Sequence, residues 1–89
     1  MQTYLVVRRS AWASKQAQQA ADERSDAQAA RMVNDIESIR SYMLEECDRT
    51  LGSVCVFVAS SPEAVRRHAA AADLPVDEIV RVANAGAAR

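Results

Sequence analysis

An unbroken apolar run at residues 54–58 is followed at once by the residues that start a helix. Every member of the run except Cys55 is β-branched or aromatic, which is typical of a strand buried on both faces. Ser-Ser-Pro-Glu at positions 60–63 then provides an N-cap, a proline for the first turn and an early carboxylate. The pattern predicts a strand that leads directly into a helix over residues 61–72, which ends before Pro75.

Two further strands are predicted near the ends of the chain. Residues 3–7 have high β propensity, and the pattern ends at Arg8 and Arg9. Their side chains are apolar on both faces of the strand, as they are in the run at 54–58. A short final strand is predicted at residues 78–82 because β-branched residues recur there.

The segment from Ser10 to about Met32 is rich in alanine and glutamine, and its propensity is strongly helical. Trp12 and several alanines at helical spacing form a broad but shallow apolar stripe. The polar run at residues 22–26 interrupts this stripe. We therefore expect the helix to fray, kink or break there, and two shorter helices fit the pattern nearly as well.

Residues 36–45 fit two patterns. Ile39 and Met43 belong to a helical stripe, whereas alternate positions also suit a strand. Periodicity alone slightly favours a helix. We predict a strand, because the run at 54–58 needs a hairpin partner and consecutive strands are usually neighbours. The polar stretch at 46–52, which ends in glycine, then forms the hairpin loop.

The predicted order is β-α-β-β-α-β, the ferredoxin-like arrangement of the α+β class. In that fold both helices cover one face of a four-stranded antiparallel sheet, and the other face is open. Strands that are apolar on both sides need cover on the open face as well. We therefore expect a face-to-face homodimer. A single domain is predicted at residues 1–82, with a flexible C-terminal tail at 83–89.

Composition narrows the classes of function. The chain has 89 residues and a net charge of −1, which predicts one small domain without an electrostatic footprint for nucleic acid. No apolar run approaches the length of a membrane span, and the N-terminus lacks a signal pattern, so no membrane partner is expected. Two cysteines do not make a disulfide framework, and the cytoplasm is the expected compartment.

Few side chains could carry chemistry. His68 is the only histidine, and its helical position predicts a sheet-facing side chain that is either a buried structural group or a ligand. Cys55 belongs to the buried strand, and Tyr42 offers an aromatic ring for a pocket that these three residues would line. No glycine-rich phosphate loop and no catalytic triad order is recognisable, so signals for an enzyme are absent.

The predicted hairpin loop is acidic. Glu45, Glu46 and Asp48 surround Cys47, and two cysteines eight residues apart do not have the spacing of a zinc site. Carboxylate oxygens are ligands for hard divalent cations. The loop is therefore expected to be solvated, with weak cation binding as the alternative.

Several stretches together resemble a known family. They are Ser41-Tyr42, Val54-Cys55-Val56-Phe57, Ser61-Pro62-Glu63-Ala64-Val65 with His68, and Leu74-Pro75-Val76-Asp77-Glu78-Ile79 with Val82. In these stretches the sequence resembles a small bacterial family of unknown function, one branch of which is a nickel-binding, nickel-responsive actinobacterial protein. The resemblance covers residues 39–82 well and the first strand loosely, and it is poor between residues 10 and 35.

The resemblance implies a dimeric ferredoxin-like fold and strengthens the prediction of a strand at 36–45. It places Cys55 at the cysteine of the family's third strand and His68 at the histidine of its second helix. The nickel-binding branch has two further histidines. At the corresponding positions this sequence has Val7 or Arg8, and Leu74.

Two hypotheses of function follow. The first, implied by the resemblance, is a small dimeric binding or accessory protein that holds nickel or another divalent cation at its surface, with His68 and nearby carboxylates as ligands. The second is a dimeric ferredoxin-like enzyme or small-molecule binder. Its pocket would lie between the sheet and the helices and would be lined by Tyr42, Cys55 and His68.

Overall fold

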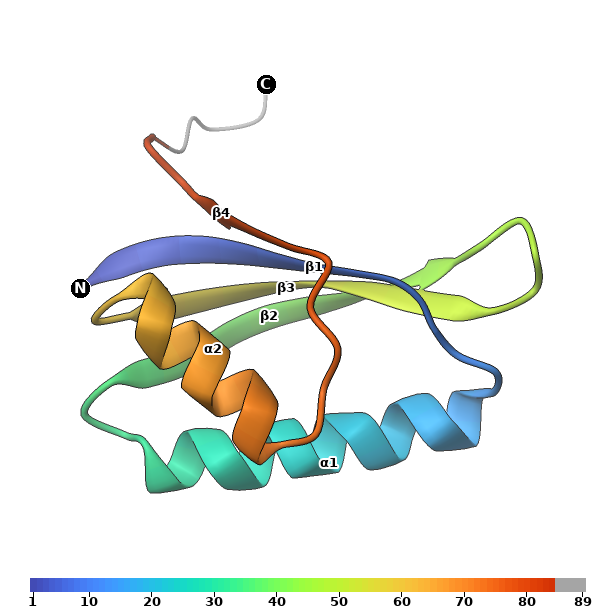
Figure 1. The fold of residues 1–89 in the computed structure, drawn as a ribbon, viewed down its shortest axis with the longest axis horizontal. Coiled ribbons are helices and arrows are strands. Elements are labelled where there is room, and N and C mark those ends of the chain that lie inside the picture. The colour runs from blue at the N-terminus through green and yellow to red at the C-terminus, as the bar shows by residue number, and fades with distance from the viewer. Residues whose placement is uncertain (85–89) are drawn as a thin grey trace.

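The chain runs through the order β-α-β-β-α-β that the sequence predicts (Figure 1). The computed structural model describes residues 1–84. Its elements are β1 (Gln2–Trp12), α1 (Lys15–Arg31), β2 (Ile36–Glu45), β3 (Leu51–Ala59), α2 (Pro62–Ala71) and β4 (Glu78–Arg81). The strands form one antiparallel sheet in the order β2-β3-β1-β4, so the fold is α+β and ferredoxin-like, as predicted. Most of the predicted tail, residues 85–89, lies outside the described residues.

Strand β3 is central and pairs with β1 on one side and β2 on the other. Its burial alternates between fully buried and half-buried positions. Cys55 and Phe57 face the helices, whereas Val54, Val56 and Val58 face the other way. The predicted division of this strand into two faces is confirmed.

Strand β1 is longer than predicted, since it continues past Arg8 and Arg9 to Trp12. The prediction that the two arginines end the strand is wrong. Arg8 follows the alternation of the strand and is buried on the helix side, opposite Ser53. The pairing then shifts register beyond Arg8, and Ser10 adopts a positive φ of 47° within this irregular stretch.

Helix α1 is continuous, and the predicted fray, kink or break at residues 22–26 is wrong. Most of those polar residues face solvent on the outer side of the helix, so they do not interrupt its packed face. Arg24 also reaches across to bind the carbonyl oxygen of Ala72, with 2.8 Å from Nε to O. The helix begins after Ser14, whose side chain accepts a hydrogen bond from the backbone of Ala17. Within residues 1–84 neither helix is long and apolar enough to cross a membrane.

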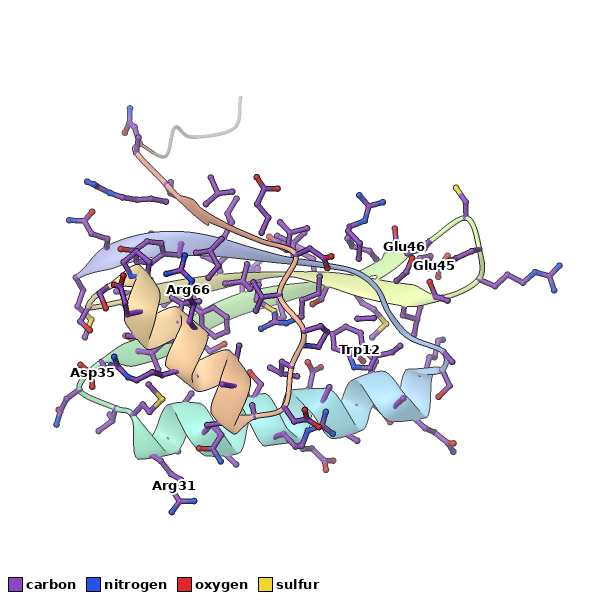
Figure 2. All side chains as sticks on the ribbon, in the orientation of Figure 1. Trp12, Arg31, Asp35, Glu45, Glu46 and Arg66 are labelled. Carbon is purple, nitrogen blue, oxygen red and sulfur yellow. The ribbon has the colours of Figure 1, made fainter. Side chains whose placement is uncertain are left out.

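Trp12, predicted on the helical stripe, instead ends β1 and lies between the sheet and α1 (Figure 2). The N-cap therefore falls at Ser14, four residues later than the predicted start at Ser10.

Residues 36–45 form strand β2, which confirms the prediction of a strand. The mixed periodicity has a structural cause, because the pairing with β3 shifts register between Ser38 and Arg40. Ile39 is the additional residue at this bulge and is exposed. Beyond the bulge Ser41 and Met43 occupy the helix side of the sheet, opposite Cys55 and Ser53 respectively.

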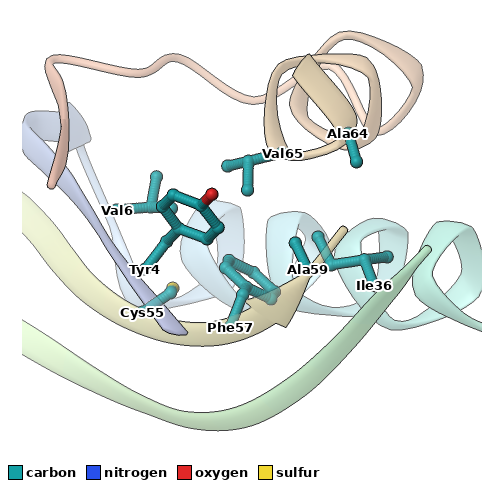
Figure 3. Packing of buried hydrophobic residues seen from close by; sticks show 8 residues of the cluster. All are labelled: Tyr4, Val6, Ile36, Cys55, Phe57, Ala59, Ala64 and Val65. Carbon is teal, nitrogen blue, oxygen red and sulfur yellow. The ribbon is translucent and has the colours of Figure 1, made fainter. Parts of the chain in front are cut away.

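The apolar core lies between the helices and one half of the sheet (Figure 3). It consists of Tyr4, Val6, Ile36, Cys55, Phe57 and Ala59 from the first three strands, with Ala64 and Val65 from α2. Helix α2 begins as predicted, with Ser61 as the N-cap and Pro62 in its first turn. Toward the hairpin the buried side chains include the polar Arg8 and Ser53 as well as Leu51.

Candidate functional site

Arg8 is the most unusual buried residue of the protein. It is 1% exposed and is the largest fully buried side chain in residues 1–84. Its Nε donates to the carbonyl oxygen of Pro75 at 2.8 Å, and its Nη1 donates to the sulfur of Cys55 at 3.2 Å. Nη2 is buried and has no hydrogen-bond partner among the described residues. The described ion pairs involve Arg9, Arg66 and Arg67 but not Arg8, although buried charges are usually paired.

Cys55 is surrounded by polar groups on the helix side of the sheet: Arg8 and Ser41 donate to its sulfur, and Ser53 accepts from it. Besides Arg8, the hydroxyl of Ser41 lies 3.3 Å from its sulfur, and the hydroxyl of Ser53 lies 3.8 Å away. The two neighbouring strands, β1 and β2, and β3 itself therefore supply the polar groups around one thiol. The exposed Cys47 of the hairpin loop and the buried Cys55 are both free.

His68 is completely buried on the sheet-facing side of α2, as predicted from its helical position. Its Nε2 lies 2.9 Å from the carbonyl oxygen of Ser25, and its ring lies 5.1 Å from that of Phe57. A carbonyl can only accept a hydrogen bond, so Nε2 carries the proton and Nδ1 holds the free lone pair. Nδ1 is buried without a hydrogen-bond partner in the part of the chain that the structure describes.

The neutral form of His68 is favoured by its surroundings. Burial lowers the pKa of His68 below the ordinary 6.5, and the nearby charge of Arg8 acts in the same direction. The hydrogen bond with Ser25 and the charge of Asp26 oppose this shift but do not reverse it. The imidazole is therefore a neutral group in the folded protein near pH 7.

We expect the free energy of unfolding to fall as the pH is lowered from 7.5 to 5.5. The unfolded chain protonates its histidine near pH 6.5, whereas folded His68 resists protonation, so acid stabilises the unfolded state until the folded pKa is passed. The slope from this group is at most about 1.4 kcal/mol per pH unit. His68→Gln should reduce the pH dependence, measured by urea unfolding at both pH values. Equal pH dependence in both proteins would contradict the assignment, since no other histidine is present.

Tyr42 does not lie with Cys55 and His68. It pairs with Val54 on the open face of the sheet and is 51% exposed, whereas the other two residues are buried on the helix side. Residues 1–84 also contain no pocket between the sheet and the helices. Within residues 1–84, Tyr42, Cys55 and His68 therefore do not line one pocket between the sheet and the helices.

The acidic hairpin loop is built into the fold. Glu46 accepts two hydrogen bonds from the guanidinium of Arg9, at 2.9 and 2.8 Å, and one from the backbone N–H of Ser10 at 2.7 Å. The hydrogen bond from Arg9 lowers the pKa of Glu46, and hydrogen bonds from Thr50 lower the pKa of Asp48. Figure 2 shows Glu45 and Glu46 beside the end of β1. The carboxylates of Glu46 and Asp48 hold the irregular stretch after Arg8 to the hairpin through Ser10.

The role of Arg8 was missing from the sequence prediction, although a signal for it was present. Position 8 continues the alternation of the buried Tyr4 and Val6, and alternate residues of a strand share a face. The alternation therefore predicts an inward side chain. The inward direction of Arg8 was not predicted, because the two consecutive arginines were expected to end the strand.

Comparison with known proteins identifies the family. A family model described as nickel responsive protein SCO4226-like matches residues 4–82. This chain belongs to the SCO4226-like family. The crystal structure of SCO4226 from Streptomyces coelicolor A3(2) is similar, with a TM-score of 0.73 and 18% identity over 94% of this chain and 99% of that chain.

A second solved structure is also similar to the SCO4226-like chain. The C-terminal domain of the MgtC protein from Mycobacterium tuberculosis has a TM-score of 0.62 and 17% identity, over 94% of this chain and 88% of that one. At such identities the two structures support the ferredoxin-like fold. A comparison with curated protein sequences finds no match.

The family description names nickel, but the donor set of this SCO4226-like protein does not fit that ion. Nowhere in residues 1–84 do three or more His, Cys, Asp or Glu side chains gather to hold a metal. The sulfur of Cys55 contacts a guanidinium, and Nε2 of His68 is bonded to the backbone of Ser25. Nickel suits imidazole nitrogen and thiolate sulfur in a set of several ligands, and a single protomer does not assemble such a set.

Proposed function

We propose that this SCO4226-like protein is a small homodimeric binding or accessory protein whose two copies meet through the open faces of their sheets. The supporting observation is the apolar character of that face. Its apolar residues are Leu5, Val7, Tyr42, Leu44, Val54, Val56, Val58 and Val80, and the same face also carries Thr3, Glu37, Arg40 and Glu78. No helix or loop of residues 1–84 covers these side chains, and contiguous apolar surface of this kind is typical of a protein interface.

The charges at the margins of the open face favour a second copy as the occupant. Arg40 lies at the β2 edge, opposite Val56, and Glu78 lies at the β4 edge, opposite Val7. A two-fold axis parallel to the strands would place β2 of each copy over β4 of the other. Arg40 would then face the β4 edge of the partner subunit, two residues along the register from Glu78, and this pairing of opposite charges would occur twice in the dimer.

A lysine at the centre of the open face should break the dimer. Val56→Lys would bury two unpaired ammonium groups per dimer, because every residue of a two-fold interface occurs twice. We expect the dimer dissociation constant to rise by at least about a hundredfold, measured by light scattering over a concentration series. Val33→Lys is the matched control, since Val33 is 72% exposed in the turn before β2. Equal dissociation constants for the two variants would place the interface elsewhere.

The remaining parts of the proposal concern location and partners. A cytoplasmic setting is supported by the free thiols of Cys47 and Cys55. A net charge of −1 gives no support for nucleic acid or membrane-surface partners. We do not propose that a single protomer binds nickel, because the donor set of Cys55 and His68 does not fit the ion.

A further inference from the structure

We propose that the buried guanidinium of Arg8 keeps divalent cations away from Cys55, and that it supplies from within the chain the positive charge that a metal ion would bring. The protein would then be a member of a nickel-responsive family whose interior is independent of nickel. This inference concerns the helix side of the sheet and does not depend on the proposed dimer.

The donors that favour a borderline metal are present in the core. Cys55 provides the only buried thiol, and His68 provides a buried imidazole with a free lone pair on Nδ1. Both side chains lie on the helix side of the sheet. Sulfur and imidazole nitrogen are ligands for nickel and zinc. At least one further donor beside Cys55 would be needed to complete a metal site, since such sites have several ligands.

Arg8 occupies a place beside Cys55 that a further metal donor would need. Its Nη1 lies 3.2 Å from the sulfur of Cys55, within hydrogen-bond distance. A doubly charged ion bound to the same sulfur would lie at near-contact distance from a permanently charged guanidinium. In a buried environment this repulsion is large, since charges a few ångströms apart interact strongly where water is excluded.

Arg8 also joins the segments that a metal could otherwise connect. It extends from β1, donates to the sulfur in β3 and donates to the carbonyl oxygen of Pro75 in the segment between α2 and β4. The same segment is held by Arg24 through Ala72 and by the backbone N–H of Asp77, which donates to Val7. A guanidinium that links three segments by hydrogen bonds can serve the structural purpose of a cation.

The test is a nickel titration of four proteins. Binding is measured by calorimetry and by the absorption band for charge transfer from thiolate to nickel. The four proteins are the wild type, Arg8→Lys, Arg8→His, and Arg8→His combined with Cys55→Ser. Arg8→Lys keeps the charge, whereas Arg8→His introduces an imidazole beside Cys55. Circular dichroism establishes which variants are folded.

We expect the wild type and Arg8→Lys to show no charge-transfer band. Arg8→His should bind nickel at least about a hundredfold more tightly than the wild type, gain thermal stability on nickel addition, and lose both effects with Cys55→Ser. A wild-type band that disappears in Cys55→Ser would overturn the proposal. So would a folded Arg8→His protein that binds nickel no better than the wild type. The wild-type titration tests the exclusion of nickel whether or not the variants fold.

Discussion

Phe57→Ala is expected to lower the free energy of unfolding by about 3–5 kcal/mol, the usual cost of removing a large aromatic side chain from a core. Phe57 is fully buried in the central strand and packs against the ring of His68 with 5.1 Å between centroids. A domain of this size has a total stability of about 5–13 kcal/mol. The variant should therefore unfold at a much lower denaturant concentration than the wild type, as measured by circular dichroism in urea.

Two further variants make the measurement specific. Phe57→Leu keeps most of the side-chain volume and should lower the free energy of unfolding by less than about 2 kcal/mol. Val33→Ala changes a residue that is 72% exposed and should cost about 0.5 kcal/mol or less. A loss in Phe57→Ala no greater than that in Val33→Ala would show that the core is not centred on β3.

Gly52→Ala is expected to destabilise the protein by about 1–3 kcal/mol or more, although it adds a single methyl group. A Cβ atom at this position would lie 2.3 Å from the carbonyl oxygen of Arg8. That oxygen belongs to the backbone, so β1 would have to move away from β3 at the point where the guanidinium of Arg8 enters the core. We therefore expect lower resistance to urea together with weaker amide protection along β1.

The neighbouring Ser53→Ala is the control for Gly52→Ala. Ser53 already carries a Cβ atom, and its hydroxyl makes one long contact, 3.8 Å from the sulfur of Cys55. Removal of this hydroxyl should lower the free energy of unfolding by about 1 kcal/mol or less. If the two substitutions had equal effects, close approach of β1 to Gly52 would not be the reason for the glycine.

Local patterns in the sequence were sufficient for most of the fold. The alternation around Cys55 and Phe57 predicted both faces of β3, and the N-cap at Ser61 predicted the start of α2. These signals depend on residues close together in the chain. The choice of a strand for residues 36–45 required a topological argument, because the bulge at Ile39 mixes the two periodicities.

The errors arose where distant contacts decide the structure. Arg8 remains in β1 because Pro75 and Cys55, far away in sequence, accept its hydrogen bonds. Helix α1 remains whole through its polar stretch while Arg24 is anchored on Ala72. Neither partner can be identified from residues near the arginine. Short-range propensity therefore predicted a strand end and a helix break that tertiary contacts override.

The candidate site was predicted only in part. The inward position of His68 followed from helical spacing, and the structure places it there. The contact between Arg8 and Cys55 was not foreseen, because Arg8 and Arg9 were predicted to end the first strand. Tyr42 was grouped with Cys55 and His68 without knowledge of which face each would occupy, and the register of β2 against β3 separates them.

Sedimentation equilibrium of the wild-type protein at micromolar concentration tests the central claim most directly. A homodimer joined through the open face predicts a mass of twice the single chain, with dissociation promoted by Val56→Lys and not by Val33→Lys. The mass of a single chain at all micromolar concentrations would contradict the account, since the apolar face around Leu5, Val56 and Val80 would then be left without a second copy to cover it.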